Sequence, residues 1–129
     1  MSVKRRVSEL EGPMLDAAVA KALGHSITFN RDGPLVDGVT APRPYSTHWN
    51  TGGQIIERER IAVLPGSGRL LGYGDSEGPQ RSEPPQWRAK MPNQQTYTLG
   101  PTPIIAAMRA YVHAKFAPPG MAFADEVEL

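Results

Sequence analysis

The sequence predicts an α+β fold in which two main helices, at about 12–23 and 103–116, pack on a small, mainly antiparallel sheet of short strands. Two segments have helical periodicity, and the short segments between them have the pattern of strands. The 13 glycines and 13 prolines favour short elements joined by long loops. At 129 residues, near the commonest domain size, the chain is expected to form a single domain over 1–129.

The first helix is predicted from an apolar repeat. Leu15, Val19 and Leu23 recur every four residues and therefore share one helical face. Pro13 suits the first turn of a helix, and Gly24 can adopt the left-handed conformation that ends one. These residues define both ends of the first helix.

The second helix begins with Thr102 as the N-cap and Pro103 at the first helical position. Its apolar stripe consists of Ile105, Met108, Val112 and Phe116. The segment Pro118–Gly120 prevents the helix from continuing.

The remaining elements are shorter. Strands are predicted at 26–29, which can extend to residue 30, and at 61–64, 86–91 and 96–99. A turn is expected at 30–33, an extended loop at 33–44, and a mobile loop at 65–85 that a strand at 69–73 can interrupt. The termini, 1–9 and 117–129, are expected to be loose because charged residues are concentrated there.

The segment Tyr45–Glu59 is the most unusual part of the sequence. Ser46 or Thr47 can cap a short helical turn that contains His48 and Trp49. Because glycine allows backbone angles that are closed to other residues, the pair that follows, Gly52 and Gly53, is expected to redirect the chain sharply. Residues 55–59 are consistent with either a helical turn or the start of a strand.

Three segments together resemble the NinX-like family of phage and prophage proteins. The first is Leu10–Gly24, and the second, Tyr45–Ile61, matches the family pattern Ser-Thr-x-Trp-x-x-Gly-Gly-x-Ile-Ile-Glu-Arg-Glu, with His48 where the pattern has Asp. The third is Gly100–Val112, with the acidic residues Asp125–Glu128. The resemblance implies a phage or prophage origin and implies no known activity.

The composition restricts the classes of function. Fourteen basic and 13 acidic residues leave a net charge of +1, without the basic excess usual for nucleic-acid binding. The absence of cysteine excludes disulfides and thiolate metal sites. No secretory signal and no apolar run of about 18 residues is present, so we expect a cytoplasmic protein that does not bind membranes.

Acid–base chemistry is one hypothesis. Glu57, Glu59 and His48, with Asp16, could serve a small hydrolase-like enzyme if the fold brought them together. The structural alternative, which we favour, is that the two carboxylates pair with arginines. The candidates are Arg58, Arg60 and Arg109.

No cofactor or metal site is predicted. The histidines His25, His48 and His113 lack the spacing that places two ligands on one helical turn. The glycines of Gly66–Gly74 lack the Gly-Lys-Ser/Thr end of a phosphate-binding loop.

Single-stranded nucleic-acid binding is another hypothesis, because aromatic and basic residues are interleaved. The aromatic residues are Trp49, Tyr73, Trp87 and Tyr97, and the basic ones are Arg58, Arg60, Arg69, Arg81, Arg88 and Lys90. The alternative, which we favour, is that the two tryptophans anchor the core.

The leading hypothesis is a non-enzymatic accessory protein that binds a host or phage protein through the loops 41–53 and 65–85. The candidate binding residues are His48, Trp49, Gly52, Gly53, Glu57, Arg58, Glu59 and Arg109.

Overall fold

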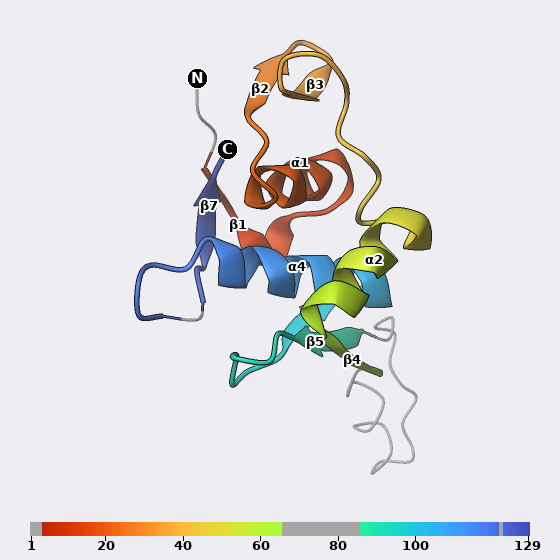
Figure 1. The fold of residues 1–129 in the computed structure, drawn as a ribbon, viewed down its shortest axis with the longest axis vertical. Coiled ribbons are helices and arrows are strands. Elements are labelled where there is room, and N and C mark those ends of the chain that lie inside the picture. The colour runs from red at the N-terminus through yellow and green to blue at the C-terminus, as the bar shows by residue number, and fades with distance from the viewer. Residues whose placement is uncertain (1–3, 66–85, 122) are drawn as a thin grey trace, which may run out of the picture.

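The computed structural model describes residues 4–65, 86–121 and 123–129, and its centre is the helix α4, Pro103–Lys115. Every residue of α4 from Ile104 to His113 is buried, because other elements cover it on several sides (Figure 1). The helices α1, Gly12–Ala22, and α2, Trp49–Glu59, both pack on it. The predicted α+β class is confirmed, and in the part of the chain that the structure describes three helices pack against small antiparallel sheets.

Both helices predicted from periodicity are present. α1 has proline in its first turn and ends before Gly24, whose φ is 106°. In α4, the Thr102 hydroxyl accepts a hydrogen bond from the backbone N–H of Ile105 at 3.1 Å, as expected of an N-cap. Local sequence signals and tertiary packing therefore agree at both helices.

A hairpin follows α1. It consists of β2, Ile27–Asn30, and β3, Gly33–Val36, which pair antiparallel. The predicted strand and turn are confirmed, whereas the prediction of an extended loop from residue 33 was wrong for 33–36. Pro34 lies opposite Phe29 and is tolerated because a two-stranded sheet consists only of edge strands.

The expected redirection of the chain at Gly52 and Gly53 was wrong, because α2 continues through both glycines as one regular helix. The ambiguous residues 55–59 are its last turns. The chain reverses instead at Arg60, which has left-handed backbone angles, with φ 56° and ψ 47°. There the N–H of Ile61 donates to the carbonyl of Ile56 at 3.0 Å.

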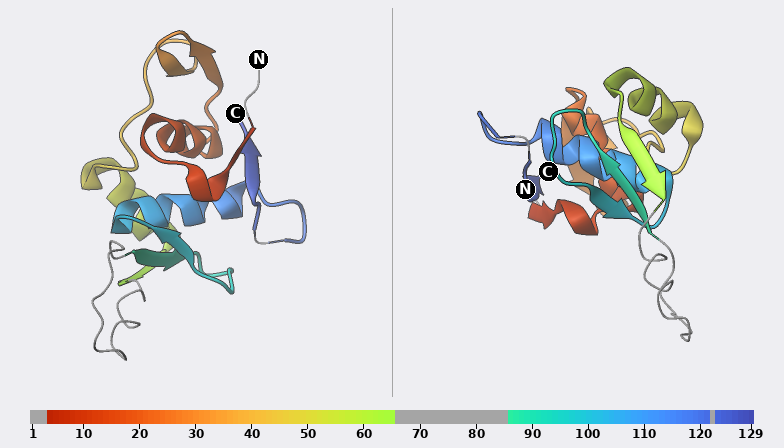
Figure 2. Two further views of the ribbon diagram at one scale, coloured as in Figure 1. Left: turned by 180° about the vertical axis from the view of Figure 1, so that it is seen from behind. Right: turned by 90° about the horizontal axis from the view of Figure 1, so that it is seen from below.

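A three-stranded antiparallel sheet covers another side of α4. Its order is β4, Ala62–Pro65, then β5, Trp87–Lys90, then β6, Thr98–Gly100. Figure 2 shows this sheet and α1 on different sides of α4. The strands predicted at 61–64, 86–91 and 96–99 are therefore confirmed, each with slightly different bounds. The predicted loop 65–85 and its strand at 69–73 lie outside the described residues, except for Pro65 in β4.

Short parts of both termini are paired, so the expectation that 1–9 and 117–129 would be loose was wrong for 4–6 and 126–128. β1, Lys4–Arg6, pairs antiparallel with β7, Glu126–Glu128. A 3-10 helix, η1, Val7–Glu9, follows β1. The apolar side chains of Val7, Val127 and Leu129 are buried in the core, which holds both ends in place despite the charges around them.

Candidate functional site

The most specific sequence segment, Tyr45–Glu59, forms a tight turn followed by α2, and a buried carboxylate fixes the turn. The Oδ1 atom of Asp16, on α1, accepts a hydrogen bond from the N–H of Ser46 at 2.7 Å, and both residues are buried. Burial raises the pKa of Asp16, while the hydrogen bonds from Ser46 oppose that shift. Asp16, which the enzyme hypothesis included, therefore connects α1 to the turn that precedes α2.

The two glycines of this segment provide space. A Cβ atom at Gly52 would overlap the carbonyl oxygen of Tyr45 and would lie 2.7 Å from Cδ1 of Ile104. Only glycine therefore allows α2 to approach both the turn and α4 this closely. A Cβ atom at Gly53 would lie 3.2 Å from Cε3 of Trp49, so this glycine makes room for the indole ring.

Trp49 is not a core anchor, and that prediction was wrong. It is the first residue of α2 and is 57% exposed. Trp87, in contrast, is half-buried and packs against the core. The difference follows from position, since Trp87 lies in the sheet over α4, whereas Trp49 begins a helix of which only Gly52 and Ile55 are buried.

His48 is the N-cap residue of α2 and is exposed, and its Nδ1 lies 3.0 Å from the hydroxyl of Thr47. The carboxylates Glu57 and Glu59 are at the other end of the helix. At 1.5 Å per residue, they are about 13 to 16 Å from His48 along the axis. The structure therefore does not bring these three residues together.

The carboxylates at the end of α2 are largely surface groups. The Nε atom of Arg58 is 3.2 Å from Oε2 of Glu59, the ion pair that the structural interpretation predicted. Glu57 is exposed and has no ion pair with any described residue. Exposed pairs of this kind contribute about 0 to 1 kcal/mol.

Arg109 lies apart from α2 and pairs with neither carboxylate. Its Nε donates to the carbonyl of Leu10 at 2.8 Å, and its Nη1 donates to the carbonyl of Leu99 at 2.9 Å. It is only 8% exposed, and this burial lowers its pKa. Arg109 thereby links α4 to the N-terminal segment and to β6.

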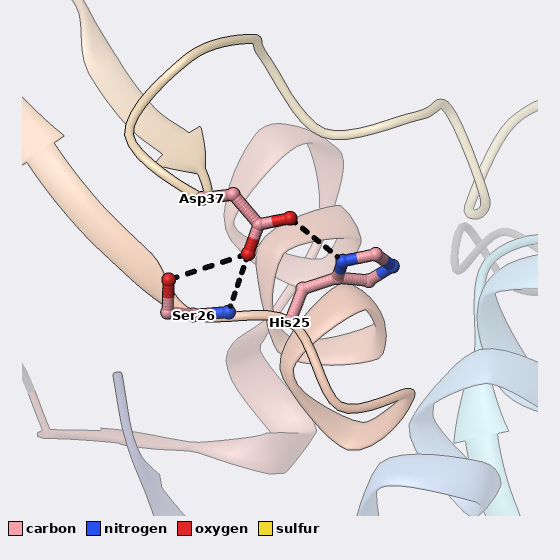
Figure 3. Close-up of polar contacts among 3 residues, drawn as sticks. All are labelled: His25, Ser26 and Asp37. Atoms are coloured by element: carbon pink, nitrogen blue, oxygen red, sulfur yellow. Dashed lines mark hydrogen bonds and ion pairs between the residues drawn. The ribbon is translucent and has the colours of Figure 1, made fainter.

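A polar cluster that the sequence did not suggest joins His25, Ser26 and Asp37 (Figure 3). Asp37 accepts hydrogen bonds from the Ser26 N–H at 3.0 Å and from the Ser26 hydroxyl at 3.3 Å, and its other oxygen is 3.0 Å from Nδ1 of His25. The pKa of Asp37 is lowered, first by the hydrogen bond from the backbone N–H of Ser26 and second by the hydrogen bond with His25.

This cluster does not have the geometry of a hydrolytic triad. The hydroxyl of Ser26 donates to Asp37 and makes no hydrogen bond to His25, so the imidazole cannot activate it. Instead, the cluster ties the end of α1 to the hairpin. The one sequence signal was the pair Asp37 and Gly38 after a strand, because Asp adopts a positive φ, here 54°, more readily than most residues.

Near this cluster, the chain between β3 and α2 borders a pocket of about 290 Å³. Its lining includes His25, Asp37, Val39, Arg43 and Tyr45. Val39 is 76% exposed. This connecting segment and the start of α2 therefore present both apolar and polar groups to solvent.

No group of three or more His, Asp or Glu side chains among the described residues could hold a metal ion. In the same residues, no helix is both long and apolar enough to cross a membrane.

A comparison with known protein families confirms the resemblance to NinX that three segments of the sequence indicated. The family model described as bacteriophage P22 NinX matches residues 6–115, which is most of the chain and includes α1, α2 and α4. No curated protein matches the sequence. The chain therefore belongs to the bacteriophage P22 NinX family.

Proposed function

We propose that this protein is a phage- or prophage-derived accessory factor that binds a host or phage protein without catalysing a reaction. The proposal rests chiefly on one observation, the 57% exposure of Trp49. Tryptophan side chains bury large areas when they find a partner, and they are enriched among the residues that dominate binding energy. We call the exposed residues Thr47–Asn50 the Trp49 face.

The Trp49 face is held in place by the fold. Gly52 fits tightly against Tyr45 and Ile104, and Gly53 leaves room for the indole, so the ring projects from a rigid helix. The hydroxyl hydrogen of Thr51 is shared between the carbonyls of Pro44, at 3.0 Å, and His48, at 3.2 Å, which fixes the preceding turn. Binding then needs little ordering of the surface, which favours affinity.

Affinity capture from the native host, with and without phage infection, tests this proposal. The wild-type protein should retain a partner that Trp49→Ala loses. Val39→Ala is the matched control, because Val39 is also an exposed apolar residue, at 76%, and lies outside both α2 and the Trp49 face. Failure to enrich any partner, or equal losses in both variants, would contradict the proposal.

The sheet favours a second candidate, single-stranded nucleic-acid binding. Arg88 and Lys90 flank the buried Ala89 in β5 and therefore share the face of the sheet opposite α4. The guanidinium carbon of Arg88 and the Nζ of Lys90 lie 5.0 and 5.2 Å from the centre of the Tyr97 ring. None of the strands β4, β5 and β6 contains an acidic residue.

Fluorescence anisotropy with a labelled oligothymidine separates the two candidates. Binding on the sheet should weaken as salt increases and should be lost in Arg88→Gln/Lys90→Gln, whereas Trp49→Ala should have no effect. No binding at low salt would eliminate this candidate and leave the protein-binding proposal intact.

A further inference from the structure

A groove of about 1030 Å³ lies on a different part of the molecule from the Trp49 face. It is bordered by β6, by the second half of α4 and by the segment that leads to β7. Its lining includes Thr98, Leu99, Arg109, His113, Phe116 and Met121. The groove is large enough for a small organic molecule or a few residues of a peptide.

Two buried polar side chains from α4, Arg109 and His113, contribute to the lining. They are four residues apart and so share one face of the helix, at 8% and 4% exposure. The Nδ1–H of His113 donates to the carbonyl of Ala124, and its ring stacks on Phe123 with centroids 3.8 Å apart. His113 is therefore held in one orientation.

Arg109 has hydrogen-bonding capacity that the protein does not use. Its two bonds, to Leu10 and Leu99, occupy Nε–H and one N–H of Nη1, and the remaining N–H groups bond to no described residue. No carboxylate among the described residues lies within 4.0 Å of it. A buried guanidinium is most stable when paired with an anion.

A structural role alone does not require this charge. Elsewhere on α4, a neutral side chain makes a similar connection. The amide of Gln94, in the loop after β5, donates a hydrogen bond to the carbonyl of Ala110 at 3.1 Å. The Gln94 side chain also accepts from the N–H of Met91 at 2.8 Å. A neutral side chain thus makes a comparable link, whereas Arg109 carries a charge and is one of the residues that line the groove.

The lining of the groove mixes polar and apolar side chains, and two of the apolar ones are open to solvent. Leu99 is 49% exposed and Met121 is 62% exposed, so two of the large hydrophobic side chains most exposed to solvent in the described residues line the same groove. Phe116 is half-buried, packs against the core and also lines the groove. Asp125 and Glu126 also line the groove and disfavour an anion at their end of it.

We propose that this groove binds an organic carboxylate with an apolar body. The carboxylate accepts from the free N–H groups of Arg109, and the apolar part lies against Leu99, Phe116 and Met121. This ligand chemistry has two sources, a free small acid or the C-terminal carboxylate of a peptide. The site is additional to the Trp49 face and does not depend on the function proposed for it.

NMR titration of the full-length protein with sodium octanoate tests the proposal, with 1-octanol as the neutral probe. Octanoate should shift the Arg109 Nε–H and His113 ring signals saturably, with a Kd of about 1 mM or tighter, and octanol should not. A capped tetrapeptide ending in leucine, compared with its C-terminal amide, tests the peptide source. Binding of the peptide acid alone would support the proposal and assign the ligand to a chain terminus.

Two outcomes would overturn it. Equal binding of octanoate and octanol would mean that the groove is merely apolar, and no saturable shift with either acid would mean that it is not a carboxylate site. Because Arg109→Lys can also disturb the fold, the decisive variant is Met121→Glu, which adds a negative charge to an exposed wall. It should weaken binding at least about tenfold. Val39→Glu, at a site 76% exposed and outside the groove, should not.

Discussion

The helices α4 and α2 pack against each other and have opposite environments. Ten consecutive residues of α4 are buried, from Ile104 to His113, whereas α2 buries only Gly52 and Ile55. α4 is therefore the element on which the others assemble, and α2 is a peripheral helix in which five of the eleven residues are exposed. The comparison indicates that substitutions in α4 should affect folding, while substitutions on the open side of α2 should affect binding.

The largest effect on folding is expected for Met108→Ala, at the centre of α4. Met108 is completely buried and belongs to the main core. Its truncation should lower the free energy of unfolding by about 2–5 kcal/mol, because a cavity remains where the side chain packed. Urea denaturation followed by circular dichroism measures this. A loss below about 1 kcal/mol would mean that α4 is not the centre of the core.

Gly52→Ala should have the next largest effect, because its Cβ atom would push α2 away from Tyr45 and α4. We expect a loss of about 1–3 kcal/mol, typical of overpacking. Gly53→Ala is the control in the same helix. Its Cβ atom meets only the side chain of Trp49, and alanine favours the helix by about 1 kcal/mol, so stability should stay equal or rise. Equal losses in both variants would contradict the proposed close contact.

Asp16→Ala tests the hydrogen bond that connects α1 to the turn before α2. It leaves the buried N–H of Ser46 without its acceptor, which should lower the free energy of unfolding by about 1–3 kcal/mol. Asp16→Asn retains an acceptor and should cost less. If both variants were as stable as the wild type, the Asp16 contact would not hold this turn.

The contact between Asp16 and Ser46 also predicts that stability depends on pH. Burial raises the pKa of Asp16 in the folded state above its ordinary value of 3.8, which applies to the unfolded state. At a pH between the two pKa values, the folded state therefore binds more protons than the unfolded state. Wild-type stability relative to Asp16→Asn should therefore increase as the pH falls through the raised pKa, and should level off below about pH 3.8. Paired urea curves at several pH values measure the difference, and an opposite slope would contradict the pKa shift.

The smallest effect on stability is expected for Trp49→Ala. Its side chain is mostly exposed, so the free energy of unfolding should change by less than about 0.5 kcal/mol. Trp87→Ala, which removes a half-buried side chain packed on the core, should cost more. The reverse order would contradict the environments assigned to the two tryptophans.

The sequence was most informative where local signals and packing coincide. Pro13 and Gly24 delimited α1, and Thr102 with Pro103 placed the start of α4, because these residues act within one turn of the chain. α2 was not predicted as one helix, since two adjacent glycines normally disfavour a helix. What overrides them is the close approach to Ile104, a contact between segments about 50 residues apart in sequence.

The candidate site was predictable only in part. The segment Tyr45–Glu59 was recognised by its family pattern, but no local feature distinguished the exposed Trp49 from the half-buried Trp87. The partner of Asp16 was equally hidden, because it lies 30 residues away at Ser46. Exposure and long-range hydrogen bonds depend on how the elements pack, which a single sequence does not specify.

Acrylamide quenching of tryptophan fluorescence tests most directly whether α2 holds the indole of Trp49 open to a partner. In Trp87→Phe, Trp49 is the sole tryptophan of the chain. We expect strong quenching in the isolated protein and clear protection once the captured partner is bound. Weak quenching in the isolated protein, or quenching unchanged by the partner, would contradict it.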